Sequence, residues 1–400
     1  MSSPFPAPRN PLENEAHAPP RPAGLLERED LPRLFDALKR AGYRIVGPTV
    51  RDGAIVYGEV GAVDDLPVGW TERQEAGRYR LERRPDAAVF GFNLGPQSWK
   101  KYLFPPRTRL WTAETRDGSF QVTPEPPDEG APYAFLGMRA CELSALSITD
   151  RVFTGGVVDP VYQGRRARIL RIAVECGQSA PTCFCTSMGT GPGADGGFDL
   201  SLTELLSPGR HVFWVRTASE AGERLASELP LRPGGPDDLR SREELLDRAA
   251  REQKRKLPAD RVRGLLLDHL EDPHWEEVAQ RCLSCGNCTM VCPTCFCSTT
   301  EEVPSLDLAR VEHWRRWDSC FNLAFSQLHT VSIRTGIKSR YRQWIDHKLA
   351  TWHDQFGSSG CVGCGRCITW CPVGIDLTEE VAALERAPPA SPPPAAGGKA

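Results

Sequence analysis

Residues 282–293 read CLSCGNCTMVCP, and residues 361–372 repeat the pattern as CVGCGRCITWCP. Both stretches have the spacing C-x2-C-x2-C-x3-C-P, which is typical of the bacterial ferredoxin run that binds [4Fe–4S] clusters. Three thiolates spaced by two residues can surround one cluster from a single loop, and the fourth cysteine then points towards the other cluster. The proline keeps the loop from continuing as a helix. Two such runs predict a C-terminal region that holds two [4Fe–4S] clusters and carries electrons.

Crosswise sharing divides these eight cysteines into two candidate sites. Site 1 comprises Cys282, Cys285, Cys288 and Cys371, and site 2 comprises Cys292, Cys361, Cys364 and Cys367. Gly286 and Gly365 are expected to relieve crowding where backbone amides approach the sulfurs. Structural zinc usually takes its cysteines as two separated pairs, and disulfides are unexpected at these spacings in a chain without an export signal. A zinc-binding interaction scaffold is the alternative of a different class.

The composition favours a reducing compartment and argues against several functions. The chain has 400 residues, enough for two or three domains, and a net charge of −3, which gives no global basic field for nucleic acid. No apolar run of about 18 residues predicts a membrane span, and the N-terminus lacks the apolar stretch of a signal peptide. The 15 cysteines are mostly clustered, which favours metal binding over a disulfide framework. We therefore expect a cytoplasmic protein that does not bind nucleic acid.

The pattern of the chain predicts an α+β protein with two folded regions between two tails. Residues 1–22 and 386–400 are rich in proline and alanine and are expected to be disordered. Residues 23–257 predict a mixed α/β domain, with a helix over 30–41 and a charged connecting helix over 241–256. Short strands are expected at residues 43–46, 54–60, 87–92, 133–137 and 168–174.

Residues 258–385 predict an α-helical ferredoxin domain with two clusters. One helix is expected over 262–270, and a second is expected to start at Asp272-Pro273 and run into Cys282. Residues 293–360 separate the two runs and are expected to be helical, because apolar residues recur at helical spacing between 337 and 352. The aromatic and basic residues between 313 and 352 are interpreted as core packing with a basic rim on a helix face, not as a nucleic-acid surface.

Seven cysteines lie outside the two runs. Cys141, Cys176, Cys183 and Cys185 could bind a third iron–sulfur cluster, here called site 3, or could be a set of buried thiols. Cys141 is expected to open a helix, where amide dipoles would favour its thiolate. Cys295, Cys297 and Cys320 supply only three ligands and stay unassigned, although a mixed site drawing on both C-x-C pairs is open.

One segment matches the glycine-rich fingerprint of dinucleotide-binding sites, which is meaningful only between a strand and a helix. Residues 191–196 read GPGADG and match G-x-G-x-x-G, but no clear strand precedes them and a proline lies inside the match. We interpret the segment as a glycine-rich loop, with a dinucleotide site as the alternative.

Several segments together resemble a known family. Residues 281–297, 317–321, 339–344 and 360–376 are similar to the β (iron–sulfur) subunit of cytoplasmic NiFe sulfhydrogenases. The iron–sulfur electron-transfer subunit of the anaerobic sulfite reductases is a similar protein. Residues 137–143 and 183–192 also resemble this family, so the likeness covers most of the chain between the tails.

The resemblance implies a role for the chain. Subunits of this kind pass electrons between a flavin subunit that handles NAD(P) and partner subunits, which are a NiFe hydrogenase or a sirohaem sulfite reductase. We therefore expect an electron-transfer subunit of a NiFe hydrogenase complex, with catalysis in the partner subunits. The alternatives are an electron-transfer subunit of a sulfite reductase and, since the hydrogenase version is linked to sulfur reduction, a subunit that itself reduces polysulfide.

Overall fold

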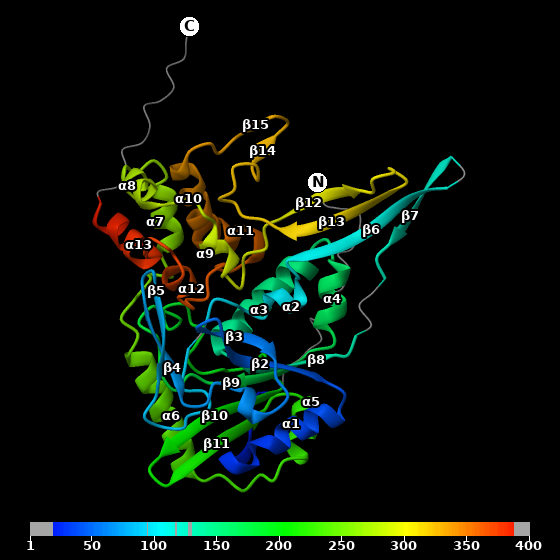
Figure 1. Cartoon of the computed structure of the whole chain (residues 1–400). Helices are drawn as coiled ribbons and strands as arrows, with labels where there is room; N and C mark the ends of the chain where they lie inside the picture. Colours follow the sequence, from blue (N-terminus) through cyan, green and yellow to red (C-terminus); the bar gives the residue numbers. More distant parts are fainter. Residues whose placement is uncertain (1–18, 94, 117, 127–129, 388–400) are drawn as a thin grey trace.

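The computed structural model describes residues 19–93, 95–116, 118–126 and 130–387 (Figure 1). The tails predicted to be disordered lie largely outside these ranges. At their inner ends the two predicted tails overlap ordered elements. Arg21 and Pro22 belong to the first strand, and Arg386 ends the last helix. The structure is a mixed α/β region followed by a region that contains both cysteine runs.

The N-terminal region is built on a seven-stranded sheet in the order β1-β11-β10-β9-β8-β2-β3. Strands β10, β9, β8 and β2 are parallel neighbours, and the other pairs are antiparallel. The predicted strands at 43–46, 54–60, 133–137 and 168–174 are all present in it. The sheet comprises β1 (Arg21–Glu27), β2 (Arg44–Arg51), β3 (Ala54–Glu59), β8 (Tyr133–Met138), β9 (Leu170–Val174), β10 (Leu200–Ser207) and β11 (Arg210–Thr217).

Helices cover the two faces of this sheet because alternate strand residues point to opposite sides. Leu136 and Ile172 pack in one core with α1 (Leu31–Arg40) and α5 (Glu220–Ser227). Phe135 and Ala173 pack in another core with α3 (Ala140–Thr154) and α4 (Pro160–Arg166). The helix predicted over 241–256 is α6 (Pro236–Arg251), and it begins five residues earlier than expected.

Residues 87–92, which we predicted to be a strand, have no regular structure. Their backbone groups are satisfied by buried side chains instead of by a neighbouring strand. The carboxylate of Glu204 accepts hydrogen bonds from the N–H groups of Val89 and Phe90, and Arg139 donates to the carbonyls of Phe90 and Phe92. Val89, Phe90 and Phe92 of this run therefore lie in the core without joining the sheet.

The C-terminal region is largely helical around the two runs. Trp275, Tyr341, Trp344 and Leu349 form its core. The predicted helices at 262–270 and from 272 onward are α7 and α8. The elements are α7 (Val262–Asp268), α8 (His274–Arg281), α9 (Asn287–Met290), α10 (Ile337–Asp346), the π-helix η3 (His347–Thr351), α11 (Trp352–Phe356), α12 (Arg366–Thr369) and α13 (Leu377–Arg386).

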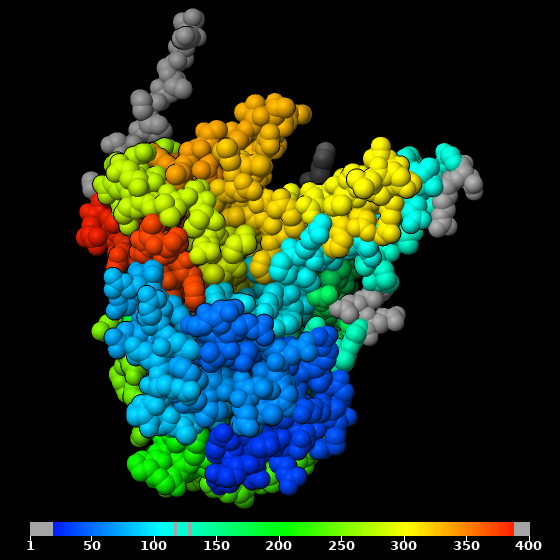
Figure 2. All heavy atoms as spheres, in the orientation of Figure 1, coloured from blue at the N-terminus to red at the C-terminus, as the bar shows by residue number. Residues whose placement is uncertain are grey.

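The expectation that helices fill the whole segment between the runs is wrong for its first half. Residues 298–317 form a β-hairpin of β12 (Ser298–Pro304) and β13 (Arg310–Trp317). This hairpin joins β6 (Arg107–Arg116) and β7 (Ser119–Pro124) of the N-terminal region in a four-stranded sheet. The two hairpins project from the body as an arm (Figure 2). The ferredoxin region is therefore not purely helical, and one sheet combines strands from both regions.

The hairpin also corrects the placement of the aromatic residues near 313. His313 and Trp314 lie on a strand, where neighbouring side chains point to opposite faces. The ring of His313 stacks on Trp111, with 4.6 Å between ring centroids, and Arg107 lies 4.1 Å from the ring centroid of Trp314. Cross-strand packing, not a helix face, explains this segment.

The minor elements complete the described chain. They are η1 (Arg28–Asp30), η2 (Val63–Asp65), the hairpin of β4 (Trp70–Glu75) and β5 (Arg78–Arg83), α2 (Lys100–Leu103), β14 (Gln327–Leu328) and β15 (Val331–Ser332).

Candidate metal centre

The two cysteine runs fold into the same local structure. Gly286 and Gly365 both have φ near +74°, a left-handed conformation that favours glycine, and each is followed by a short helix, α9 or α12. The N–H of Ser284 donates to Cys282 Sγ at 3.3 Å, and the N–H of Gly363 donates to Cys361 Sγ at 3.4 Å. The same sequence spacing therefore produces two equivalent loops that present three sulfurs each.

The structure brings the four cysteines of site 1 together. Burial raises the pKa of Cys282 and Cys288, and the adjacent sulfurs of Cys371 and Cys285 raise both values further. Site 1 surrounds a small cavity of about 30 Å³ whose other walls include Tyr341 and Trp344. Cys371, from the end of the second run, thus lies beside the first run.

The four cysteines of site 2 also come together. Cys292 leaves the first loop and lies beside the thiols of the second. Burial raises the pKa of Cys361 to about 12 although Lys348 and the N–H of Gly363 lower it, and the sulfurs of Cys364 and Cys292 add smaller increases. Burial likewise raises the pKa of Cys367, and the sulfurs of Cys361, Cys364 and Cys292 add to it. Cys292 of the first run therefore lies among the cysteines of the second run.

Two buried lysines lie beside these sulfurs, and their positive charges bear on whether the sulfurs could form an anionic metal site. Lys348 is 4% exposed, and its ammonium donates to Cys292 Sγ at 3.3 Å. Burial lowers the pKa of Lys348, but the sulfurs of Cys292, Cys295 and Cys361 raise it more, to well above its usual value. Lys100 is 9% exposed and donates to the carbonyl of Cys295 at 2.9 Å. A buried ammonium needs an anionic neighbour, which metal-bound thiolates supply.

The spacing of the sulfurs differs from that of a mononuclear site. In the part of the chain that the structure describes, no three His, Cys, Asp or Glu side chains converge as ligands of a single ion do. The four ligands of a cubane bind four different irons, so the ligand set encloses a group larger than one ion. The donor set at sites 1 and 2 is four cysteines each, which is the set that [4Fe–4S] clusters take.

A buried ion pair ties site 2 to the N-terminal region. Arg366, 1% exposed, lies between Cys364 and Cys367 and pairs with Glu142 of α3. Arg366 also donates to the carbonyls of Gly95 and Gln97. The carboxylate of Glu142 accepts from Tyr57, Trp99 and the N–H of Arg139 as well, so both charges are satisfied.

The parallel strands position site 3. Cys141 and Cys176 follow the carboxyl ends of the adjacent strands β8 and β9, and the loop after β9 returns Cys183 and Cys185 to the same edge. Burial raises the pKa of all four thiols, and each is raised further by at least one charged neighbour or other thiol. The expectation that helix dipoles favour a thiolate at Cys141 is wrong for the isolated thiol, because burial outweighs them. The thiol of Cys185 lies close enough to Cys141 and Cys183 to raise the pKa of both, and Cys176 lies close enough to raise the pKa of the other three.

The first C-x-C loop packs backbone to backbone on the second ferredoxin run. The N–H of Phe184 donates to the carbonyl of Gly363 at 2.9 Å. A Cβ added at Gly363 would lie 2.6 Å from the carbonyl of Phe184, and one added at Gly365 would lie 2.4 Å from that of Thr182. Burial raises the pKa of Cys185 to about 12 although Gln253 donates to its sulfur at 3.1 Å. Site 3 therefore adjoins site 2 directly.

The three unassigned cysteines lie between sites 1 and 2. Cys320 contacts Cys297, and this contact lowers the pKa of Cys297 to about 7 and raises that of Cys320. Cys295 contacts Cys292 and lies near Cys297. The unassigned cysteines therefore adjoin the two runs, and in the described structure Cys176 is linked to the second run only through its neighbours Cys141, Cys183 and Cys185.

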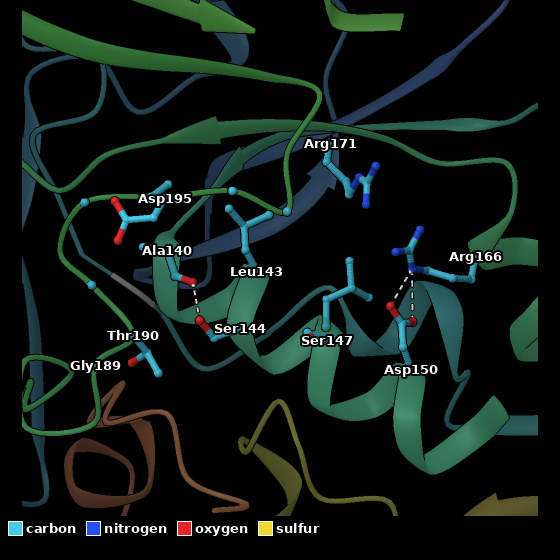
Figure 3. A pocket seen from close by; sticks show the side chains of 16 residues that line it. Ala140, Leu143, Ser144, Ser147, Asp150, Arg166, Arg171, Gly189, Thr190 and Asp195 are labelled. Atoms are coloured by element: carbon cyan, nitrogen blue, oxygen red, sulfur yellow. Dashed lines mark hydrogen bonds and ion pairs between the residues drawn. The ribbon is translucent and has the colours of Figure 1, made fainter. Parts of the chain in front are cut away.

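The glycine-rich match lies beside site 3 but lacks the context of a dinucleotide fingerprint. Residues 191–196 belong to the loop between β9 and β10, which does not open a helix. The loop lines a pocket of about 430 Å³ together with Ser144 and Ser147 of α3 (Figure 3). Arg166 at its edge pairs with Asp150. The segment is a glycine-rich loop, as we interpreted it, and its Gly191 approaches Cys185 Sγ.

Sequence reasoning missed the charged groups around the cysteines. Arg366 lies inside the second run and Glu142 directly follows Cys141, so proximity in sequence could have pointed to both. Lys100 and Lys348 are far from any cysteine in the sequence, and nothing in their neighbourhoods signals a buried ammonium. Within the described residues, no helix combines the length and the apolar character needed to cross a membrane.

Comparisons with known proteins agree with this geometry. Residues 281–375 match the family model of the 4Fe-4S dicluster domain. The chain is 27% identical over 358 residues to sulfhydrogenase 2 subunit beta of Pyrococcus furiosus, and the alignment covers 88% of this chain and 95% of that protein. No solved structure matches the chain. The resemblance noted in the sequence is confirmed: over most of its length the chain is similar to a sulfhydrogenase β subunit, and its residues 281–375 match the model of a 4Fe-4S dicluster domain.

Proposed function

We propose that the chain is the iron–sulfur electron-transfer subunit of a multisubunit cytoplasmic NiFe hydrogenase of the sulfhydrogenase type. The family match and the dicluster domain support an iron–sulfur electron-transfer subunit. Cys282, Cys285, Cys288 and Cys371 would hold one [4Fe–4S] cluster, and Cys292, Cys361, Cys364 and Cys367 would hold the second. Each cluster, when bound, accepts and releases one electron.

The observation that carries this proposal is the continuity of the cysteine sites. The sulfur of Cys292 is close enough to that of Cys288 to raise its pKa, and the sulfur of Cys364 does the same for Cys141 and Cys183. The sites therefore run in the order site 1, site 2, site 3. The residues of this chain position and shield the sites, and a continuous series of redox sites suits a relay between two partner subunits.

Site 3 is proposed to hold a third [4Fe–4S] cluster. About twelve irons per chain would support it, and about eight would contradict it. The variant Cys183→Ser is expected to lose about four irons, because a cubane needs its four ligands. Cys320→Ser is the matched control, since Cys320 is a partly buried thiol outside all three sites. Loss of four irons from Cys320→Ser instead would move the third cluster to the unassigned cysteines.

The proposed partners are a flavin subunit that handles NAD(P) and a NiFe hydrogenase subunit. Anaerobic co-purification with identification of the associated subunits tests this. Recovery of a sirohaem protein in place of a NiFe subunit would assign the chain to a sulfite reductase instead. Recovery of neither would contradict both assignments.

A second candidate function is reduction of polysulfide by this subunit. The pocket of about 430 Å³ favours it, because its glycine-rich wall touches Cys185 of site 3 and leaves room for a small substrate. Sulfide production by the isolated subunit with a chemical reductant would support it. Absence of turnover in protein that carries its full iron content would remove it.

A further inference from the structure

Lys348 stands apart from the other cations near the cysteine sites. Its ammonium contacts Cys292 Sγ at 3.3 Å, Thr294 Oγ1 at 3.0 Å and the carbonyl of Gly360 at 3.2 Å. No carboxylate pairs with it in the described part of the chain, and only 4% of the residue is exposed. Its positive charge is therefore balanced by sulfur alone.

Three other cations lie nearby, and each is either neutralised or donates to oxygen instead of sulfur. Lys100 donates to the carbonyl of Cys295 at 2.9 Å. Arg366, beside Cys364, pairs with the carboxylate of Glu142. Arg340, near site 1, donates to Ser284 Oγ and to the carbonyls of Arg334 and Thr335. Among the described residues, no cationic side chain donates a hydrogen bond to a site 1 sulfur. The two sites thus share a loop structure, and among the described residues only site 2 has a ligand sulfur that accepts a hydrogen bond from a lysine ammonium.

The backbone explains how Lys348 reaches the sulfur. It lies in η3, the π-helical stretch that interrupts the α-helix between α10 and α11. One-turn π segments inside α-helices are frequent at functional sites because they redirect side chains. The carbonyl of Lys348 also accepts from the N–H of Gly360, which holds η3 against the start of the second run.

We infer that Lys348 raises the midpoint potential of the cluster held at site 2. This inference rests on the proposed function, because it takes Cys292, Cys361, Cys364 and Cys367 as cluster ligands. Reduction adds one negative charge to the cluster. An N–H donor to a ligand sulfur and an unneutralised positive charge at low dielectric both stabilise the reduced form more than the oxidised form. Lys348 thus places a positive charge beside the ligand Cys292 and acts through it. It affects site 2, the middle one of the three sites.

The test compares Lys348→Met with Lys348→Arg by anaerobic redox titration monitored by EPR. At a fixed applied potential, the ratio of reduced to oxidised site 2 cluster should be at least about tenfold lower in Lys348→Met. For one electron this corresponds to a midpoint potential lower by about 59 mV. Lys348→Arg keeps the charge and should stay close to the unaltered protein. Site 1 is the internal reference, and Cys292→Ser assigns the site 2 signal.

The control variant is Lys39→Met, which removes an exposed lysine on α1, on the far side of the large sheet from the cysteines. It should leave both potentials in place. A site 2 potential unchanged in Lys348→Met would overturn the inference, as would an equal shift at both sites. Lys348→Gln is the second variant, and it should also lower the site 2 potential because it removes the charge.

The outcomes separate this inference from the proposed function. Unaltered protein without [4Fe–4S] signals would refute the proposed function. If the unaltered protein shows two [4Fe–4S] signals but the site 2 potential does not change in Lys348→Met, only the role of Lys348 is refuted. Loss of the site 2 cluster from both neutral variants would also overturn the inference, because the ammonium would then be needed to assemble the site instead of to set its potential.

Discussion

The two ferredoxin runs have the same spacing and the same loop structure, but they lie in different surroundings. The first run is near the surface, with Cys285 exposed and Leu283 62% exposed. The second run is pressed against the N-terminal region, where Arg366 and Val362 are buried. The motif therefore determines how sulfurs are presented, and the residues between the cysteines determine what each loop contacts.

The position before the third cysteine of each run shows this difference most clearly. It is Asn287 in the first run and Arg366 in the second. Asn287 is exposed and donates one hydrogen bond, to the carbonyl of Trp370 at 2.8 Å. Arg366 is buried with Glu142. Asn287 joins the first run to the second by one hydrogen bond, whereas Arg366 joins the second run to the N-terminal region by a buried ion pair.

The largest expected effect is at Arg366. The variant Arg366→Met leaves the carboxylate of Glu142 buried without its cation, which should lower the free energy of unfolding by about 3–5 kcal/mol. Asn287→Ala, the matched change in the first run, should cost about 0.5–1.5 kcal/mol, because it removes one neutral hydrogen bond. Anaerobic urea unfolding followed by circular dichroism measures both.

A double variant checks the cause of that effect. Glu142→Gln removes the unpaired charge, so Arg366→Met with Glu142→Gln should be less destabilised than the sum of the two single variants. Equal costs for Arg366→Met and Asn287→Ala would contradict the contrast between the runs.

The next largest effect distinguishes the two equivalent glycines. A Cβ at either residue meets a left-handed backbone, which costs about 1–2 kcal/mol. In Gly365→Ala the new atom would also lie 2.4 Å from the carbonyl of Thr182, whereas in Gly286→Ala it would lie 2.9 Å from the movable side chain of Ser319. We expect Gly365→Ala to cost about 2–4 kcal/mol, because backbone must shift as well.

Iron analysis sharpens this comparison. Gly365→Ala should reduce the iron content, since the displaced Thr182 belongs to the loop that carries Cys183 and Cys185. Gly286→Ala should keep its iron. Retention of full iron by both variants, with similar unfolding midpoints, would show that the second run tolerates movement of its neighbour.

Local patterns in the sequence predicted the fold where neighbouring residues decide it. The spacing of the runs led to the grouping at sites 1 and 2, and the strand patterns at 43–46 and 133–137 predicted β2 and β8 correctly. The predicted role of glycine was incomplete: Gly365 is required by its φ and by the backbone of Thr182, and not only by access to sulfur.

Predictions failed where distant segments decide the structure. Residues 313–317 read HWRRW, which fits helical spacing, but β13 pairs with β6, a partner about 200 residues away that no local pattern reveals. Residues 87–92 look like a strand, yet Glu204 and Arg139 satisfy their backbone groups. Lys348 resembles any surface lysine in sequence, because its burial depends on the π-helical turn and on Cys292.

The smallest expected effect concerns Asp346, the residue before η3. Burial raises the pKa of Asp346 to about 7, with a partial opposing effect of Arg342, and its Oδ1 has no hydrogen-bond partner in the described structure. An unfolded aspartate has a pKa of about 3.9. Between these values the folded chain binds a proton that the unfolded chain has lost, so stability is highest below about pH 4, decreases as the pH rises to about 7 and levels off above it.

Asp346→Asn imitates the protonated carboxyl and removes this dependence. At pH 6 the variant should already be the more stable of the two, because the unfolded aspartate is ionised there and the folded carboxyl has to take up a proton. The advantage of the variant should grow by a further ~1–1.5 kcal/mol, roughly one pKa unit, between pH 6 and pH 8, as the folded carboxyl passes through its own pKa. Asp36→Asn, at an exposed position on α1, should change stability by less than about 0.5 kcal/mol at either pH. Urea midpoints at the two pH values measure the difference. A gain at pH 6 as large as at pH 8 would contradict the raised pKa, because the benefit would then come from the amide's hydrogen bonds and not from the lost charge.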